Sequence, residues 1–445
     1  MRFKLKAADL IQALKTVSNV TPKPITPQGG VGYLFKTYRD TEGLPRCFVY
    51  SRDQSEVARA DIALLELDGE GAFIAPLKLT DGIQYIPDYE IDFDVKADGD
   101  THSVKYRATS PESSSSRPAV REATSFDPRL ISPIDKDFEA ATQKKTFASG
   151  ILREALGLSK KFIADAKETR GEDHLQTVQI FDLSNELWAK GNGTMFSTNG
   201  TKAFYFYSEA FEDKGMAIHA QHIDRLTSFL GKCEGNVEFR SGDRMMFAAQ
   251  DIMGKAKDAA PVKLGEQVFG WAYHTKTHSK WSYYPLKLDK YILRMSKLTL
   301  VNAINYTRTA LEPNRDKIRI HYNAEKKEMN FSVSDTTTKT DSFAVPVEVD
   351  LADDADFDYS LNIVQLLELI EGVKGYDVQF RVSPVPKDER RPKGAAIFRT
   401  IDEFWMDANG KVIGGVSSEK DEAGNEKRPD GGFKCRVTRF MPSKD

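Results

Sequence analysis

The sequence predicts an α+β protein built from three similar domains, in each of which two helices pack on antiparallel sheet. The first observation is a common order of strand, helix, strands, helix and strand that recurs three times along the 445 residues. The second is the length, which exceeds one ordinary hydrophobic core. The third is a set of short strands separated by Asn-Gly turn signals, which is typical of antiparallel hairpins. We expect domains at 1–140, 141–280 and 281–445, with a long insertion near 407–432 in the last.

The first helix of each unit is predicted from apolar residues that recur three and four positions apart, as Leu152, Ala155 and Leu156 do. A short extended segment precedes each helix. Ser149 and Asp289 are the expected N-caps of the second and third of these helices. Their expected ranges are 7–17, 151–167 and 290–311.

Strands and a second helix follow in each unit. We expect strands at 176–183, 186–190, 195–197 and 203–207 in the second unit, and at 317–322, 329–333 and 342–349 in the third. The second helices are expected at 76–86, 220–232 and 361–373. Each of these leads into a further strand, at 90–95, 236–239 and 376–382. The insertion at 407–432 is expected to form a long exposed hairpin.

Positive charge is concentrated on the predicted first helices, although the whole chain carries a net charge of −3. The segment 290–311 has no Asp or Glu, in a chain with 66 acidic residues. A helix turning 100° per residue would bring its basic residues into one sector. The expected DNA-contacting side chains are Lys15, Arg153, Lys160, Lys167, Lys290, Arg294, Lys297 and Arg308. Such contacts would be to phosphates, independent of base sequence and weakened by salt. The alternative is an ordinary solvated helix face.

Three cysteines, Cys47, Cys233 and Cys435, are far apart and odd in number. This pattern argues against a disulfide framework and favours a reducing compartment. No stretch approaches the ~20 apolar residues that span a bilayer. We therefore expect a cytoplasmic protein with no membrane partner.

Motifs of catalysis are not found in the sequence, so we expect a protein that is not an enzyme and needs no cofactor. The phosphate-binding glycine loops, the His-Glu-x-x-His pattern and paired-cysteine metal sites are all missing. His274 and His278 are four residues apart, but no third ligand accompanies them. No metal site is predicted.

Several segments resemble the bacterial-type β sliding clamp, the DNA polymerase III β subunit family. Val17-Ser18 followed by Lys23-Pro24-Ile25-Thr26-Pro27 is similar to the family's V-S…R-P-T-L-P segment. Ser125-Phe126-Asp127-Pro128 stands where the family closes its first domain with a D-F-P-type sequence. The resemblance covers nearly the whole chain at low identity. It implies a homodimeric ring that encircles duplex DNA and tethers the replicative polymerase, and it makes Lys23 a DNA contact.

Two further segments resemble the peptide site at which this family binds polymerases and the clamp loader. Residues 197–203, Ser-Thr-Asn-Gly-Thr-Lys-Ala, are similar to the family's A-T-D-G-H-R-L turn, and Phe440-Met441-Pro442 to its terminal V-M-P-M. The residues that the resemblance assigns to this site are Leu175, Thr198, Gly200, Lys202, Ala203, Met441 and Pro442. The sequence departs from the family at Asn199, at Thr201-Lys202 and at its polar end. These departures predict either a different peptide preference or a poorly formed groove. Together with the insertion they suggest a phage-encoded member of the family.

Two other functions stay open at this point. One is a DNA-binding accessory protein that forms no ring, which a particle of one chain would indicate. The other is an enzyme whose site lies between the second and third domains, which a bound metabolite or a cluster of perturbed carboxylates would indicate.

Overall fold

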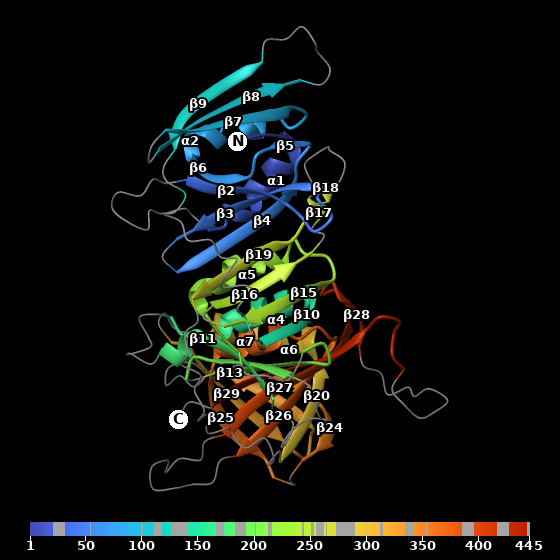
Figure 1. The fold of residues 1–445 in the computed structure, drawn as a ribbon. Coiled ribbons are helices and arrows are strands. Elements are labelled where there is room, and N and C mark those ends of the chain that lie inside the picture. Colours follow the sequence, from blue (N-terminus) through green and yellow to red (C-terminus); the bar gives the residue numbers. More distant parts are fainter. Residues whose placement is uncertain are drawn as a thin grey trace. The chain divides into compact units, whose positions relative to one another are not determined.

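The structure of the chain is a computed structural model, and Figure 1 shows its fold. It describes the whole chain except residues 21–31, 54, 99–100, 111–117, 126–127, 129–140, 142, 166–172, 183–192, 201, 212–215, 243, 251–252, 255–261, 264, 273–289, 312–314, 334–341, 353–354, 385–395, 416–426 and 443–445.

The chain forms two compact units. The first contains Met1–Arg153 and Asp224–Thr275, and the second contains Glu154–Ile223 and Lys276–Asp445. The predicted division into three domains at 140 and 280 stays a prediction. The mixture of helices with antiparallel sheets confirms the α+β class.

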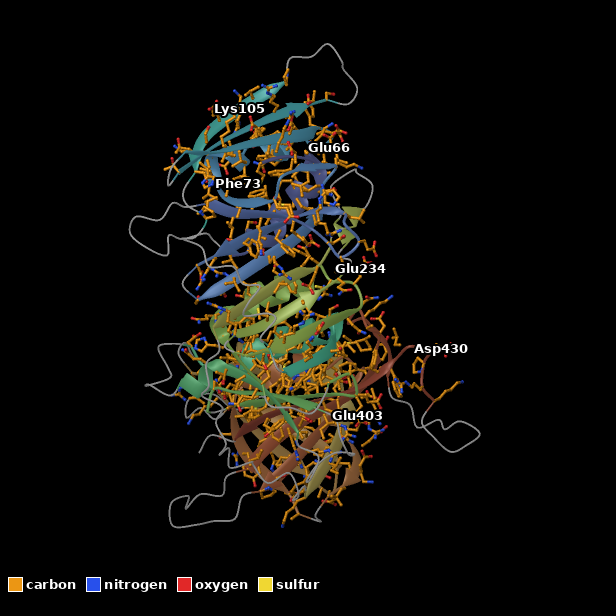
Figure 2. All side chains as sticks on the ribbon, in the orientation of Figure 1. Glu66, Phe73, Lys105, Glu234, Glu403 and Asp430 are labelled. Atoms are coloured by element: carbon orange, nitrogen blue, oxygen red, sulfur yellow. The ribbon has the colours of Figure 1, made fainter. Side chains whose placement is uncertain are left out.

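The first unit contains a five-stranded and an eight-stranded antiparallel sheet. An aromatic core joins Phe3 and Phe93 of the smaller sheet to Phe35 and Phe73 of the larger, with ring centroids 4.9 to 6.0 Å apart. Figure 2 labels Phe73. Removing one such buried ring would cost about 3–5 kcal/mol. The smaller sheet has the order β5 (Glu66–Asp68), β1 (Arg2–Lys6), β7 (Glu90–Asp98), β8 (Thr101–Thr109), β9 (Ala119–Ser125). The larger has the order β10 (Gln143–Ala148), β15 (Asn236–Ser241), β16 (Arg244–Ala249), β19 (Gln267–Ala272), β4 (Glu56–Ala63), β3 (Pro45–Arg52), β2 (Gly32–Arg39), β6 (Gly71–Pro76), and a two-stranded pair, β17 (Met253–Gly254) and β18 (Val262–Lys263), lies apart.

The second unit contains a four-stranded sheet and a larger antiparallel sheet. One core cluster takes side chains from both sheets, among them Ile320, Phe331, Phe380 and Phe398. The smaller sheet has the order β23 (Phe343–Pro346), β22 (Glu328–Ser332), β21 (Lys317–Asn323), β25 (Phe357–Asn362). The larger has the order β14 (Met216–His219), β11 (Thr177–Asp182), β12 (Gly193–Thr198), β13 (Ala203–Ser208), β29 (Phe433–Pro442), β27 (Ala396–Met406), β26 (Asp377–Pro384), β20 (Tyr291–Ser296), β24 (Glu348–Leu351), with β28 (Val412–Gly415) also on β27.

The predicted helices are present, the first at its predicted bounds and the others with shorter ranges. They are α1 (Ala7–Val17), α2 (Leu77–Thr80), α4 (Ser149–Ser159), α5 (Ala220–Leu230), α6 (Lys297–Thr309) and α7 (Ile363–Glu371), with the 3-10 turns η1 (Ile83–Tyr85), η3 (Lys160–Phe162) and η4 (Asp173–Gln176). The helix expected at 76–86 is reduced to α2 and η1. It ends at Thr80-Asp81-Gly82, residues of low helix propensity. Ser149 is not a free cap, since its hydroxyl donates to the Cys233 carbonyl at 3.2 Å.

The prediction of one helix over 290–311 is wrong at its N-terminal end. Residues Tyr291–Ser296 form β20, and α6 begins at Lys297. In this strand Tyr291, Leu293 and Met295 are buried in alternation, which is the period of a strand. The side chain of Ser296 caps α6 by accepting from the Thr299 amide. Asp289, the predicted cap, lies outside the described residues.

The strand expected at 342–349 is two strands in different sheets, β23 and β24, separated at Val347. The insertion at 407–432 begins as a hairpin, in which β28 pairs with β27 after a turn closed by Asp407 and Lys411. The remainder, residues 416–426, and the expected strand 186–190 lie outside the described chain.

The described elements repeat more finely than the sequence indicated. A strand, a helix and three strands follow one another six times. The copies are β1-α1-β2-β3-β4, β6-α2-β7-β8-β9, β10-α4-β11-β12-β13, β14-α5-β15-β16-β19, β20-α6-β21-β22-β23 and β25-α7-β26-β27-β29. Short extra strands lie between the copies, as β5 and β24 do, or within them, as β17, β18 and β28 do.

The last strand of one copy pairs with the last strand of the copy three places further along the chain. β4, from copy one, pairs antiparallel with β19, from copy four, over five residue pairs. β13, from copy three, pairs in the same way with β29, from copy six, over six residue pairs. Within the described chain, β9 has a strand neighbour only in β8, and β23 only in β22. Copies two and five therefore each end in an edge strand.

Candidate nucleic-acid and peptide interfaces

Two of the predicted DNA contacts come together in the first unit. Lys15 lies exposed in the last turn of α1, and Arg153 lies exposed on α4. Lys232, just after α5, donates from its Nζ to the Lys15 carbonyl at 3.0 Å. A Cβ added to Gly231 would lie 3.4 Å from Nη1 of Arg153, so this guanidinium also rests against the end of α5. We call Lys15, Arg153 and Lys232 the cation cluster.

The cation cluster has the electrostatics of an anion site. Burial lowers the pKa of the Lys232 ammonium below its ordinary value, and the neighbouring charge of Lys15 lowers it further. Like charges held together in this way are stabilised by an anion between them. A phosphate group would meet this need without any reading of base sequence.

The stripe predicted on the third helix is not assembled. Lys290 precedes β20, and Arg294 lies on β20, where it pairs with Asp350 at 3.1 Å. Lys297, at the start of α6, donates from Nζ to the carbonyls of Glu371 at 3.0 Å and Val373 at 2.6 Å. It therefore completes the C-terminal end of α7, where backbone carbonyls carry partial negative charge.

Among the four basic residues predicted for that stripe, only Arg308 is an exposed side chain on the outer face of α6. Leu298 and Tyr306 of the same helix are also exposed, at 70% and 50%. Lys160 is exposed in η3, at the end of α4. Lys23 and Lys167 lie outside the described residues.

The turn at 198–202 is closed by hydrogen bonds from its own side chains and main chain. The Thr198 hydroxyl donates to the Lys202 carbonyl at 2.7 Å and accepts from the Gly200 amide at 3.0 Å. Asn199 accepts from the Lys202 amide at 2.9 Å through its side-chain oxygen. Gly200 has a φ of +87°, a conformation that favours glycine. Asn199, a departure from the family sequence, thus preserves the turn.

The other residues assigned to the peptide site lie on neighbouring elements of the second unit. Ala203 pairs with Phe440 across β13 and β29, and Met441 and Pro442 pair with Phe398 and Ile397 across β29 and β27. Leu175, Ala203 and Met441 are buried, at 8%, 2% and 1% exposure. Leu175 lies against the turn, since a Cβ on Gly200 would be 3.8 Å from its Cδ1.

Three residues that the sequence did not indicate complete this surface. Glu368 of α7 forms an ion pair with Lys202. The Lys202 ammonium also lies 5.3 Å from the ring centroid of Phe162 in η3, a cation–π contact. Val364, one turn before Glu368 on α7, is 50% exposed. We call Lys202, Glu368, Phe162 and Val364 the ion-pair surface.

The described residues contain no group of three His, Cys, Asp or Glu side chains that could hold a metal ion. His274 and His278 fall outside them. No helix in the described part of the chain is long and apolar enough to cross a membrane. Cys47, Cys233 and Cys435 are free thiols.

Comparison with known proteins places this architecture. No protein-family model matches the sequence, and no curated protein matches it either. Among solved structures, the DNA polymerase III subunit beta from Pseudomonas aeruginosa matches with a TM-score of 0.65 at 13% identity, covering 100% of both chains. The Helicobacter pylori beta clamp, in complex with carprofen, and the DNA polymerase sliding clamp from Caulobacter crescentus match with TM-scores of 0.64 at 12% and 10% identity, again over 100% of both chains. The chain therefore has, over its full length, the fold of the bacterial DNA polymerase III beta subunits, the sliding clamps.

Proposed function

We propose that the protein is a DNA sliding clamp, two copies of which close head to tail into a ring around duplex DNA. The observation that carries this proposal is the pairing of last strands, copy one with copy four and copy three with copy six. Each of these pairings joins copies that are three apart in order. Three places on from copy five, past the end of the chain, is copy two of a second chain. Edge strand β23 of one chain would then pair with edge strand β9 of the other.

Head-to-tail pairing of this kind closes into a ring or grows into an open filament. A ring of two chains contains twelve strand-helix-strand copies and no unpaired edge at the joints. The full-length likeness to sliding clamps supports closure. Two exposed edge strands that each have one neighbour would otherwise invite uncontrolled association.

The cation cluster is the proposed principal contact with DNA, with Arg308 and Lys160 as further contacts. A chain with net charge −3 has little general affinity for a polyanion, so local cations must supply it. Weak phosphate contacts suit a protein that moves along DNA, because retention comes from the closed ring. In this proposal the protein catalyses no reaction and holds the polymerase on DNA in the cytoplasm.

The tether requires a second contact, with the polymerase and with the loader that opens the ring. We propose that short peptides of these partners bind beside the 198–202 turn, at the ion-pair surface. Support comes from the resemblance of residues 197–203 and 440–442 to the family's peptide site. Opposing it are the buried side chains of Leu175 and Met441, which leave Val364, Lys202 and Glu368 as the accessible contacts.

Retention on DNA tests the ring. Loaded onto nicked circular DNA, the protein should stay bound after dilution and should leave once the circle is cut. A matched control carries roadblocks at both ends of the cut DNA, which should restore retention. Equal release from circular and linear DNA would contradict a topological link.

A further inference from the structure

The ion-pair surface joins a turn of the chain to a helix that lies 166 positions further along. The two charged side chains differ in their environment. Lys202 is 11% exposed and Glu368 is 32% exposed. An approaching ligand therefore meets the carboxylate before it meets the ammonium.

The ammonium is held in place from several sides. The main chain of Lys202 makes three of the hydrogen bonds that close the turn, to Thr198 and Asn199. Its Nζ lies over Phe162, whose own ring stacks on Phe204 at 5.1 Å. Phe162 and Phe204 are buried, so this aromatic pair gives the ammonium a rigid support.

The carboxylate is the more easily exchanged member. Glu368 projects from the same face of α7 as Val364, four positions earlier, and this face is open at Val364. A glutamate on a half-open helix face can rotate into water at little cost. A cation left without a partner near an aromatic ring and under a bound ligand would be strongly disfavoured. A ligand that covers Lys202 must therefore supply a replacement anion.

The surrounding charge favours an acidic ligand. Lys160 and Lys161 are exposed in η3, immediately before Phe162, and Lys202 adds a third positive charge. Counted by sequence over residues 160–165, 198–202 and 363–371, these three lysines stand against Asp165, Glu368 and Glu371, so positive charge exceeds negative charge once Glu368 has moved away. A basic ligand would instead have to approach two exposed lysines.

We propose that the partner peptide carries an acidic side chain, which displaces Glu368 and pairs with Lys202 while an adjacent apolar side chain covers Val364. This inference rests on the peptide site of the proposed function and specifies its partner. Glu368 thereby acts as an internal competitor that lowers the affinity of the site and excludes peptides without an acid.

Selection from an unbiased hexapeptide library tests the proposal. The full-length protein is compared with the double variant Lys202→Glu/Glu368→Lys, which keeps an ion pair but reverses its polarity. Peptides retained by the natural protein should be enriched in Asp and Glu beside an apolar residue, by about fivefold over the input. Those retained by the double variant should be enriched in Lys and Arg. Identical charge preferences in the two selections would overturn the proposal.

Two further variants locate the binding and identify the competitor. Glu368→Gln should bind the selected acidic peptides more tightly, by about threefold or more, because the competing carboxylate is gone. Val364→Arg should lose them. Peptides that still bind Val364→Arg at full affinity occupy another surface and overturn the assignment, as does a library from which nothing is retained. Retention of the same proteins on circular DNA is measured separately. A negative peptide selection would then overturn the peptide proposal alone, and a failure of retention would overturn the ring alone.

Discussion

Lys297 carries a positive charge at a position where the sequence suggested a contact with DNA. Its ammonium is instead bound to two carbonyls at the C-terminal end of α7. The Gly372 carbonyl accepts from Arg439 at 2.6 Å, and the Leu369 carbonyl accepts from Thr400 at 3.1 Å. The end of this helix is thus satisfied by side chains, and Lys297 is part of the folded framework.

Replacing Lys297 with Met should therefore lower the free energy of unfolding, by about 1–3 kcal/mol, because two carbonyls lose a charged donor. Chemical denaturation of the full chain measures this. The matched control is Arg308→Gln on the exposed face of α6, which should change stability by less than about 0.5 kcal/mol. The control should weaken equilibrium binding to short linear DNA at unchanged stability. Equal stability of both variants would show that the capping contacts contribute nothing.

The cation cluster should give the protein a pH-dependent stability at alkaline pH. The folded state holds the pKa of Lys232 below the ordinary 10.5, so it binds fewer protons than the unfolded state between the two values. The free energy of unfolding should then rise with pH across that interval, and the penalty should be complete below the lowered pKa. Denaturation of the natural protein and of Lys232→Met is measured from about pH 7 to about pH 10.5. As the pH rises, the free energy of unfolding of the natural protein should increase relative to that of the variant.

Lys15→Met is the control for this titration. It removes the like charge beside Lys232, so the pKa of Lys232 should move back toward its ordinary value. The alkaline gain in stability should then be smaller than in the natural protein. A stability difference between the natural protein and Lys232→Met that stays constant with pH would mean that Lys232 titrates normally in the fold.

The sequence could indicate single residues of these sites but not their partners. Thr198, Gly200 and Lys202 could be placed in a turn because a local turn has a local signature. Glu368 could not be found, because its role depends on the folding of α7 against a turn 166 positions away. The carbonyl contacts of Lys297 were hidden for the same reason, since nothing near it in the sequence shows that it reaches the end of another helix.

At the scale of elements, α1 was predicted at its observed bounds, Ala7–Val17, because its apolar residues repeat every three or four positions. The segment from Tyr291 to Ser296 satisfied that pattern at Ile292, Met295 and Ser296 and also the alternation of a strand. Six residues are too few to separate the two periods, and pairing with β26 decided the outcome.

The edge strands β9 and β23 give a prediction for assembly. Val120 on β9 and Ala344 on β23 are exposed in the single chain. Placing Lys at both positions should put like charges on either side of the proposed joint and weaken association by about tenfold or more. Sedimentation should show a particle of twice 50.0 kDa for the natural protein and of 50.0 kDa for the double variant.

The matched control pairs Val120→Lys with Ala344→Asp, which introduces opposite charges and should retain much of the association. Loss of association in both double variants would point to general damage of the edges. A natural protein that sediments as a single chain at micromolar concentration would exclude a stable ring.

The molecule as a whole should respond to salt in two ways. Equilibrium binding to short linear DNA depends on a few phosphate contacts and should weaken by about tenfold or more between about 50 and about 200 mM salt. Retention of the loaded protein on circular DNA should change much less, because escape requires the ring to open. A parallel decline of both quantities would indicate that phosphate contacts alone hold the protein on DNA.

The order of elements along the chain predicted the α+β fold, and the local periods of helices and turns suggested a threefold unit. The finer sixfold repeat was hidden, since α2 is only four residues long and extra strands interrupt the copies. The pairing of β4 with β19 and of β13 with β29 is a contact between distant segments, for which one sequence holds no signal. The strands that would close a ring became apparent only from these pairings.

The lengths of the joining strands have a mechanical consequence. The joint between β13 and β29 has six residue pairs and that between β4 and β19 has five, and each is backed by covalent continuity of the chain. The joint between two copies would depend on β23, which has four residues and ends in Pro346, a residue that cannot donate to a neighbouring strand. When the ring is pulled apart, the pairing between β23 and β9 should break first. DNA would therefore enter the ring through the interface between the two chains, and not through an opening within one chain.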